Sequence, residues 1–361
     1  MTNIFFQKKI RIFQVGLVLF ILMFFVWFRF NIQDATGKGS DFDYIRQESL
    51  KLSRGEHIYS RILTGSLTHE EASGGKLPVL LPSVYYFIGF FTNYGKISLE
   101  KSYDNFQYLI LVSDAISALF IYKYLRRKKG LIVAVLGLLF FLFNRWSTNA
   151  FFGGYFDPVA LMFLIVSIYY FGKRNVLSAI LLSCSILFKH FGIFVLPVYF
   201  IFWLNRNGLK TSIKNVLMVV VPVILISIPV ALMDFKGFFY SIMFNFTRKS
   251  DDNFFLPLMD KVSTIAYQEG VLKNRFLVLS INRLYFLISY IPILLAGFYS
   301  KFTFKQCIFL VFFWFFLFNS KAFPQYYVWF IGTGLLALGD FTNMSIKNIH
   351  IEQENKLTGL E

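Results

Sequence analysis

The chain has 361 residues, of which 56% are hydrophobic, 20% are aromatic and only 16% are charged, and its formal net charge is +16. An average soluble domain is about one-quarter charged, so this sequence lacks the polar surface that would cover it in water. The composition excludes a soluble domain. The many apolar runs close to about 20 residues predict an all-α, polytopic transmembrane helical bundle.

The positive charge does not indicate a nucleic-acid partner. Basic residues gather in short hydrophilic breaks between apolar runs, which is the pattern of cytoplasmic loops in membrane proteins. The two cysteines, Cys184 and Cys307, each lie inside an apolar run, so we expect buried thiols and neither a disulfide nor a metal framework.

The first apolar run covers residues 12–30. It resembles a signal peptide superficially, but it is long and no small-x-small cleavage site follows it, so we interpret it as a retained span. Basic residues then mark five hydrophilic breaks, at positions 8–11, 126–129, 173–174, 206–214 and 301–305. If all five are cytoplasmic, an even number of crossings must separate each neighbouring pair.

Three apolar runs separate the first two breaks, at 12–30, 77–91 and 106–124. The middle run is short and contains Pro78 and Pro82, so we predict that it lies in the outer interface without crossing. The chain then has about ten spans with both termini cytoplasmic. Eleven spans, with the second basic break outside, is the alternative.

This topology predicts a single integral membrane domain over 1–361. It contains an outer loop at 31–105 with interfacial amphipathic helices, a second large outer loop at 234–275 and a cytoplasmic tail at 340–361. The cytoplasmic loops are too short for a nucleotide-binding domain, and no Walker motif or internal repeat occurs. Function is therefore expected on the non-cytoplasmic face.

Two carboxylates, Asp41 and Asp43, open the first outer loop. They suit a general base with a neighbour, or a metal site, although solvated loop acids are the simpler interpretation. The stretch at 45–52 that follows is amphipathic, so it is expected to lie along the membrane surface and to hold the acids at headgroup level.

Cations occupy further outer turns. Lys76 follows two glycines, and Lys189 with His190 forms the apex of a hairpin whose arms are too short for upright spans. Each lysine could extend to the surface as an anchor or bind a lipid phosphate. Asp157 lies at the mouth of a span, and Asp114 lies within one, where it faces a cavity or is satisfied by a hydroxyl.

Several of these segments resemble the motifs of one protein family, both in their order along the chain and in the side of the membrane on which they are predicted to lie. They are, in chain order, Asp41-Phe42 with Gly55 and Tyr59, then Lys76-x-Pro78, Gly154-x-x-Asp157, Lys189 and Phe323-Pro324-Gln325-Tyr326-x-x-Trp329. The pattern resembles the lipid-linked-sugar-dependent glycosyltransferases of the GT-C fold, above all their bacterial mannosyltransferase-like branch (the DUF2029/GT87 family).

The resemblance implies an inverting transfer of a hexose, mannose-like, from a polyprenyl-phosphate donor to a glycolipid or glycan acceptor. It implies a bacterial cytoplasmic membrane with the active site facing outside, and membrane lipids as the surroundings. Asp41 would be the base, with Asp43 as the second candidate. The donor-phosphate and substrate-binding residues would be Lys76, Asp157, Lys189, His190, Lys321, Gln325 and Tyr326.

No cofactor is expected, although related oligosaccharyl transferases hold a divalent metal with acids near such loops, so a metal stays open. Two other functions stay open as well. A lipid-linked-sugar transporter or flippase would place polar groups near mid-membrane, and a non-catalytic subunit of a glycan-assembly complex would differ only in whether Asp41 matters.

Overall fold

The computed structural model of the chain describes residues 2–32, 40–60, 80–247, 288–318 and 324–341. Every regular element in these ranges is a helix, which confirms the predicted all-α class. Four helical stretches are long and apolar enough to cross a membrane: Ile12–Asn31, Leu99–Lys129, Leu131–Gly153 and His190–Met233. The chain is therefore an integral membrane protein.

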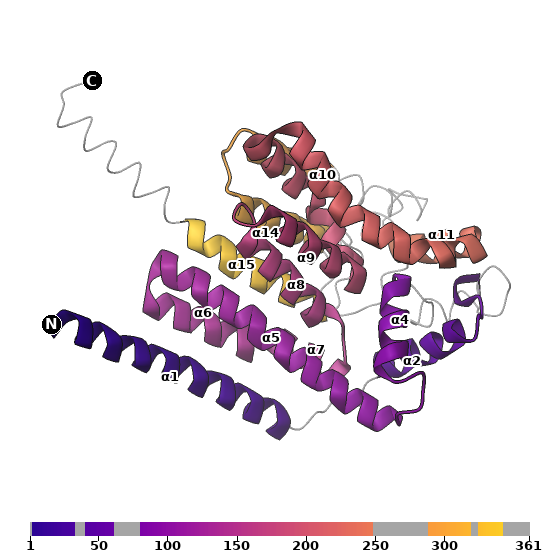
Figure 1. Ribbon diagram of the computed structural model, residues 1–361, viewed down its shortest axis with the longest axis horizontal. Coiled ribbons are helices and arrows are strands. Elements are labelled where there is room, and N and C mark those ends of the chain that lie inside the picture. Colours follow the sequence, from indigo (N-terminus) through magenta and orange to yellow (C-terminus); the bar gives the residue numbers. More distant parts are fainter. Residues whose placement is uncertain (1, 33–39, 61–79, 248–287, 319–323, 342–361) are drawn as a thin grey trace, which may run out of the picture.

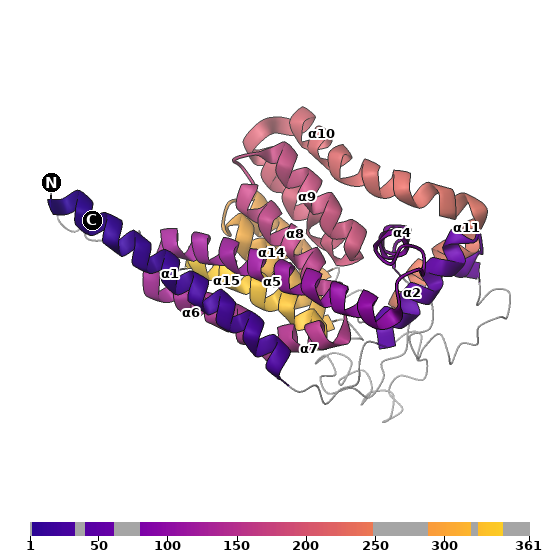
Figure 2. The same ribbon diagram turned by 60° about the horizontal axis from the view of Figure 1, so that its bottom comes forward.

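The first third of the chain contains two long helices with short ones between them. The elements are α1 (Thr2–Asn31), α2 (Ser40–Ser53), the 3-10 helix η1 (Ile58–Ser60), α4 (Pro82–Phe91) and α5 (Leu99–Lys129). Helices α1 and α5 lie along one side of the bundle and run in opposite directions (Figures 1 and 2). The ten residues of α4 span only about 15 Å, too little for the hydrocarbon core, as the sequence predicted for this segment.

The middle of the chain is built from short helices, most of which fill the centre of the bundle. They are α6 (Leu131–Phe143), α7 (Arg145–Gly153), α8 (Asp157–Tyr170), α9 (Asn175–Phe188) and the 3-10 helix η3 (His190–Val195). The connection between α6 and α8 thus contains a helix of its own, α7. Asn144 ends α6 and caps α7, because its side chain accepts a hydrogen bond from the backbone N–H of Ser147 at 2.8 Å.

The last part begins with α10 (Leu196–Met233), which Gly208, at φ +75°, divides into two arms. Leu196, Pro197 and Phe200 of the first arm line the same groove as residues 213–217 of the second, so the arms fold back on each other. The remaining elements are α11 (Phe235–Thr247), a helix at Ile288–Phe298, α14 (Phe304–Phe318), the 3-10 helix η4 (Pro324–Tyr326) and α15 (Tyr327–Phe341).

Four of the predicted basic breaks meet at one end of the bundle, which we call the basic end. The α8–α9 loop joins the break in α10 through a hydrogen bond from Asn175 to Asn207 at 3.1 Å. Asn205 donates to the carbonyl of Phe298 at 2.9 Å. The end of α5, the start of α14 and the end of α15 are joined by a buried cluster, in which Tyr124 and Lys305 both bind Asp340. The prediction that these breaks share one side agrees with this arrangement.

The opposite end, which we call the site end, gathers the short helices α2, α4 and α11 (Figure 2). Tyr59 of η1 connects them. Its hydroxyl donates to the carbonyl of Leu80 at 2.7 Å, its own carbonyl accepts from Ser241 at 2.9 Å, and its ring lies 5.2 Å from that of Phe238. Burial raises the pKa of the Tyr59 hydroxyl, so it remains a neutral donor.

The two cysteines are free thiols. Cys307 is buried, as expected. The expectation was wrong for Cys184, which is only half-buried. A thiol behaves as a small apolar group, so exposing it to lipid costs little.

Accessibility from the two sides of the membrane tests the predicted orientation. In a Cys184→Ser/Cys307→Ser background, a cysteine replacing the exposed Lys101, in the first turn of α5 at the site end, should react with an impermeant maleimide in intact cells. A cysteine replacing the exposed Asn207, at the basic end, should react only after permeabilisation. Labelling of both positions from outside would contradict their placement at opposite ends.

Candidate active site

Asp157 is the central acid of the site end. It lies in the first turn of α8, followed by Pro158, and its side chain is completely buried. One carboxylate oxygen accepts a hydrogen bond from the indole N–H of Trp329 at 2.9 Å, and the other lies 3.2 Å from the Lys189 ammonium. These two contacts give each carboxylate oxygen of Asp157 an N–H partner at the start of α8.

Lys189 lies where α9 ends and the chain turns into η3. Its side chain is 11% exposed, and it pairs with Asp157. Its Nζ also lies 4.9 Å from the centre of the Tyr326 ring and 5.4 Å from that of Phe191. The interpretation of Lys189 as a surface anchor is therefore wrong. A charge at this depth is costly without a partner, and the fold supplies one.

His190 and Gln325 lie next to this pair along the chain. His190 opens η3, and its Nδ1 is buried without a hydrogen-bond partner. Gln325 is 5% exposed and precedes Tyr326 within η4. Three of the predicted substrate-binding residues, Asp157, Lys189 and Tyr326, are thus brought together from three separate segments, and His190 and Gln325 are their neighbours along the chain.

The two predicted acids of the first outer loop lie in the first turns of α2 and not in an irregular loop, because acids favour a helix N-terminus. Asp43 is half-exposed and accepts a hydrogen bond from Gln47 at 2.9 Å. The side chain of Asp41 lies outside the described residues, as do Lys76 and Lys321.

Phe42, between the two acids, anchors α2 to the rest of the site end. It is completely buried, with its ring 5.0 Å from that of Phe106 and 5.8 Å from that of Tyr103 on α5. A Cβ on Gly154 would lie 3.2 Å from the Phe42 Cβ and 3.0 Å from the Tyr103 ring. Gly154 has φ +61° and ends α7 three residues before Asp157, so the first-loop helix packs directly on the turn that leads to the central acid.

A second buried ion pair joins Asp114 and Arg29, and the sequence pointed only to Asp114. Asp114, expected to face the bundle interior, accepts a hydrogen bond from Ser147 at 2.7 Å and lies 3.8 Å from the guanidinium of Arg29. Arg29 is completely buried on α1 and also donates to Ser147 and to the carbonyl of Leu142. No sequence prediction used Arg29, although an arginine at the end of a long apolar run was a signal for a buried partner.

Metal binding was left open, and the described residues contain no group of three or more His, Cys, Asp or Glu side chains placed to hold an ion. Trp329, which belongs to the sequence motif but had no assigned role, donates a hydrogen bond to the central carboxylate.

No protein family model matches the sequence, and a comparison with curated proteins finds no significant similarity. The glycosyltransferase resemblance therefore stays a prediction.

Replacing Gly154 tests the contact between α2 and the α7–α8 turn. Gly154→Ala should lose about 1–2 kcal/mol for the left-handed backbone and about 1–3 kcal/mol more for crowding Phe42 and Tyr103. Gly55→Ala is the matched control, because Gly55 follows α2 at φ +79° with nothing within 4 Å. Thermal unfolding in detergent should show the larger loss for Gly154→Ala, and equal losses would contradict the contact.

The Asp157–Lys189 pair should behave as a buried unit. Asp157→Asn or Lys189→Met alone leaves one uncompensated partner and should cost about 3–5 kcal/mol of unfolding free energy, whereas the double variant should cost less than the sum. Lys305→Met is the control. Lys305 is 20% exposed, and without it Asp340 still accepts a hydrogen bond from Tyr124. Denaturant titration in micelles measures the unfolding free energies of the two single variants and of the double variant. Additive losses would show that the two side chains do not interact.

Proposed function

We propose that this chain is an inverting glycosyltransferase of GT-C-like architecture, with about ten spans, that moves a hexose from a polyprenyl-phosphate donor to a glycolipid or glycan acceptor. The observation that carries the proposal is the meeting of three distant segments at the site end. The segments around Asp157, Lys189 and Tyr326 were each selected from the sequence, and they contact one another around a buried ion pair.

The shape of the bundle supports a reaction site that is recessed from the ends of the longest helices. Helices α8, α9 and α15 have 14, 14 and 15 residues, so each spans only about 21–23 Å. The start of α8, the end of α9 and the start of α15 meet at the site end, and their meeting point therefore lies below the level reached by the first turn of the 31-residue α5. A recessed polar site beside interfacial helices suits a substrate whose lipid stays in the bilayer.

The ion pair supports a role in binding the donor phosphate. Asp157 holds the Lys189 ammonium in place within an apolar bundle, so the cation is already positioned when a phosphate arrives. As the sugar leaves the phosphate, negative charge grows on the leaving oxygen, and a fixed cation stabilises that charge most strongly in a site from which water is excluded. The phosphate then needs no general acid.

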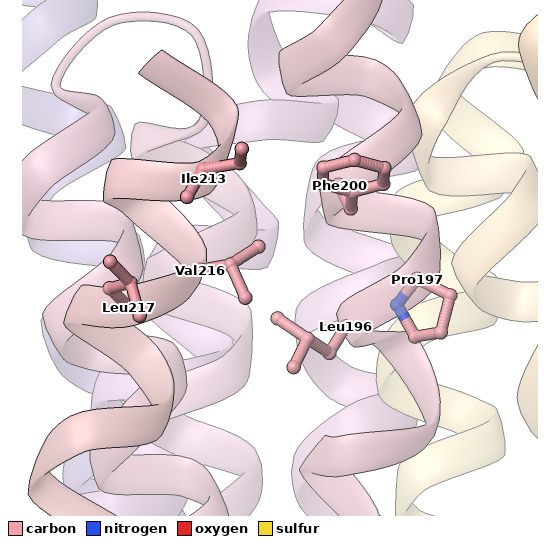
Figure 3. A pocket seen from close by; sticks show the side chains of 6 residues that line it. All are labelled: Leu196, Pro197, Phe200, Ile213, Val216 and Leu217. Atoms are coloured by element: carbon pink, nitrogen blue, oxygen red, sulfur yellow. The ribbon is translucent and has the colours of Figure 1, made fainter. Parts of the chain in front are cut away.

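An apolar groove supports a lipid-borne donor. It has a volume of about 330 Å³ and is lined entirely by apolar side chains of the two arms of α10 (Figure 3): Leu196, Pro197, Phe200, Ile213, Val216 and Leu217. The first of these residues follows directly after η3, the segment that begins with His190. An isoprenoid chain lying in this groove would place its phosphate near Lys189.

The reaction needs one base. The acceptor hydroxyl attacks C1 of the sugar and its proton passes to a carboxylate, while the bond from C1 to the phosphate oxygen breaks and its electron pair leaves with the polyprenyl phosphate. A single displacement inverts C1. We assign the base to Asp41, because α2 carries it to the turn that leads to Asp157. Asp43 is the alternative base, although its carboxylate already accepts the Gln47 amide.

A transporter or flippase is less well supported by the described residues. Arg29 and Asp114, the second buried pair, lie near each other and share Ser147, so they join α1, α5 and α7 and do not line a path. A non-catalytic subunit would have the same fold, and only activity distinguishes it from an enzyme.

Substitution of the acids tests the proposed chemistry. Purified protein should transfer radiolabelled hexose from its polyprenyl phosphate to a membrane glycolipid extract, and Asp41→Asn should slow transfer by about 10²–10⁴-fold while donor binding persists, because only the base is removed. Glu56→Gln, an exposed acid beyond the same helix, is the control and should leave the rate unchanged. Loss with Asp43→Asn alone would reassign the base, and full activity of both variants would sink the enzymatic proposal.

A further inference from the structure

An aromatic cluster lies at the basic end, where α5 and α8 finish side by side. The ring of Phe120 on α5 is 4.9 Å from that of Tyr169 and 6.0 Å from that of Tyr170, and the two tyrosine rings are 5.4 Å apart. Both tyrosines occupy the last turn of α8 and are half-buried. Tyrosines in this position are typical of the membrane–water interface, where the ring meets lipid and the hydroxyl meets water.

Four cations surround these three rings. The ammonium of Lys123 lies 5.7 Å from the centre of the Phe120 ring. Two cations lie over the Tyr169 ring: the Lys173 ammonium is 4.1 Å and the Arg127 guanidinium 5.9 Å from its centre. Arg174 lies 5.9 Å from the Tyr170 ring. All four cationic side chains are exposed. We call these four residues the basic cluster.

No carboxylate neutralises the basic cluster within the described part of the chain. The ion pairs found there involve Arg29, Lys51, Lys189 and Lys305, and none involves a member of the cluster. The last turn of α5 adds Arg126, Lys128 and Lys129. The C-terminal dipole of α5 offsets only about half a charge, and the N-terminus of α9 at Asn175 adds about half a positive charge beside Arg174.

Lipid-facing apolar surface begins directly beside the cluster. Val176 and Ile180 lie one turn apart on α9, just after Arg174, and their side chains are 46% and 48% exposed. A cationic, tyrosine-rich patch that continues into an exposed apolar stripe matches an anionic phospholipid, which joins a phosphate to acyl chains. A soluble anion would use only the first half of this surface.

We propose that the basic cluster binds the headgroup of an anionic phospholipid from the leaflet at the basic end. Arg127 offers the phosphate a planar fork of N–H donors, Lys173 adds a point charge held over the same tyrosine ring, and the acyl chains pass along Val176 and Ile180. The site lies at the opposite end of α8 from Asp157, about 20 Å away, so it does not depend on the proposed catalytic function.

Lipid binding by the full-length protein in detergent tests this site. Native mass spectrometry should show preferential retention of phosphatidylglycerol over phosphatidylcholine with the same acyl chains. The Arg127→Gln/Lys173→Gln variant should bind phosphatidylglycerol at least about tenfold more weakly, because two charge-assisted contacts are lost. Lys210→Gln/Lys214→Gln removes the same charge from exposed lysines of another basic break and should change affinity less than about threefold.

Further variants distinguish a specific lipid site from non-specific electrostatic attraction between the basic surface and anionic lipid. An Arg127→Lys/Lys173→Arg variant keeps the charge and should retain most binding, and gel filtration confirms that each variant is folded. Equal weakening in both glutamine variants, or equal retention of the two lipids, would overturn the proposal. Displacement of phosphatidylglycerol by inorganic phosphate alone would also overturn it, because it would identify a free-phosphate site.

Discussion

A charge placed inside an apolar bundle must find a partner there, and the site end is organised around this constraint. The Lys189 ammonium lies 3.2 Å from the Asp157 carboxylate, which Trp329 holds from the other side. These three residues come from the junction of α9 with η3 and from the starts of α8 and α15, so the pair and its Trp329 contact join segments as far as 172 residues apart. Taking both charges out of water is expensive, and the pair is better understood as specifying an arrangement than as adding stability.

The same constraint acts a second time between α1, α5 and α7. Arg29 lies near Asp114, and both bind Ser147, which follows the Asn144 cap of α7. The end of α1 is thereby tied to the helix that leads to Gly154 and Asp157, and α1 itself leads towards α2. The two buried pairs therefore position the elements on which the proposed chemistry depends, although neither pair includes the proposed base.

Charge is handled differently at the two ends of the bundle. At the site end, the central cation Lys189 is buried and paired with an acid, which holds its charge away from water. At the basic end, Arg127 and Lys173 are exposed and rest on aromatic rings. Cations of that kind remain available to the surrounding lipid. This difference fits the chemistry proposed for the site end and the lipid binding proposed for the basic end.

The sequence by itself determined the helical class and the presence of long apolar helices, because apolar runs depend on local composition. It also predicted that α4 would not cross and that Asp157, Lys189 and Tyr326 would be important. Only the tertiary structure decided which of them meet. The partnership of Asp157 with Lys189 and Trp329, the burial of Arg29 against Asp114, and the packing of Phe42 on Gly154 join segments far apart in the chain. Such contacts depend on how helices pack, and hydropathy and spacing carry no information about that.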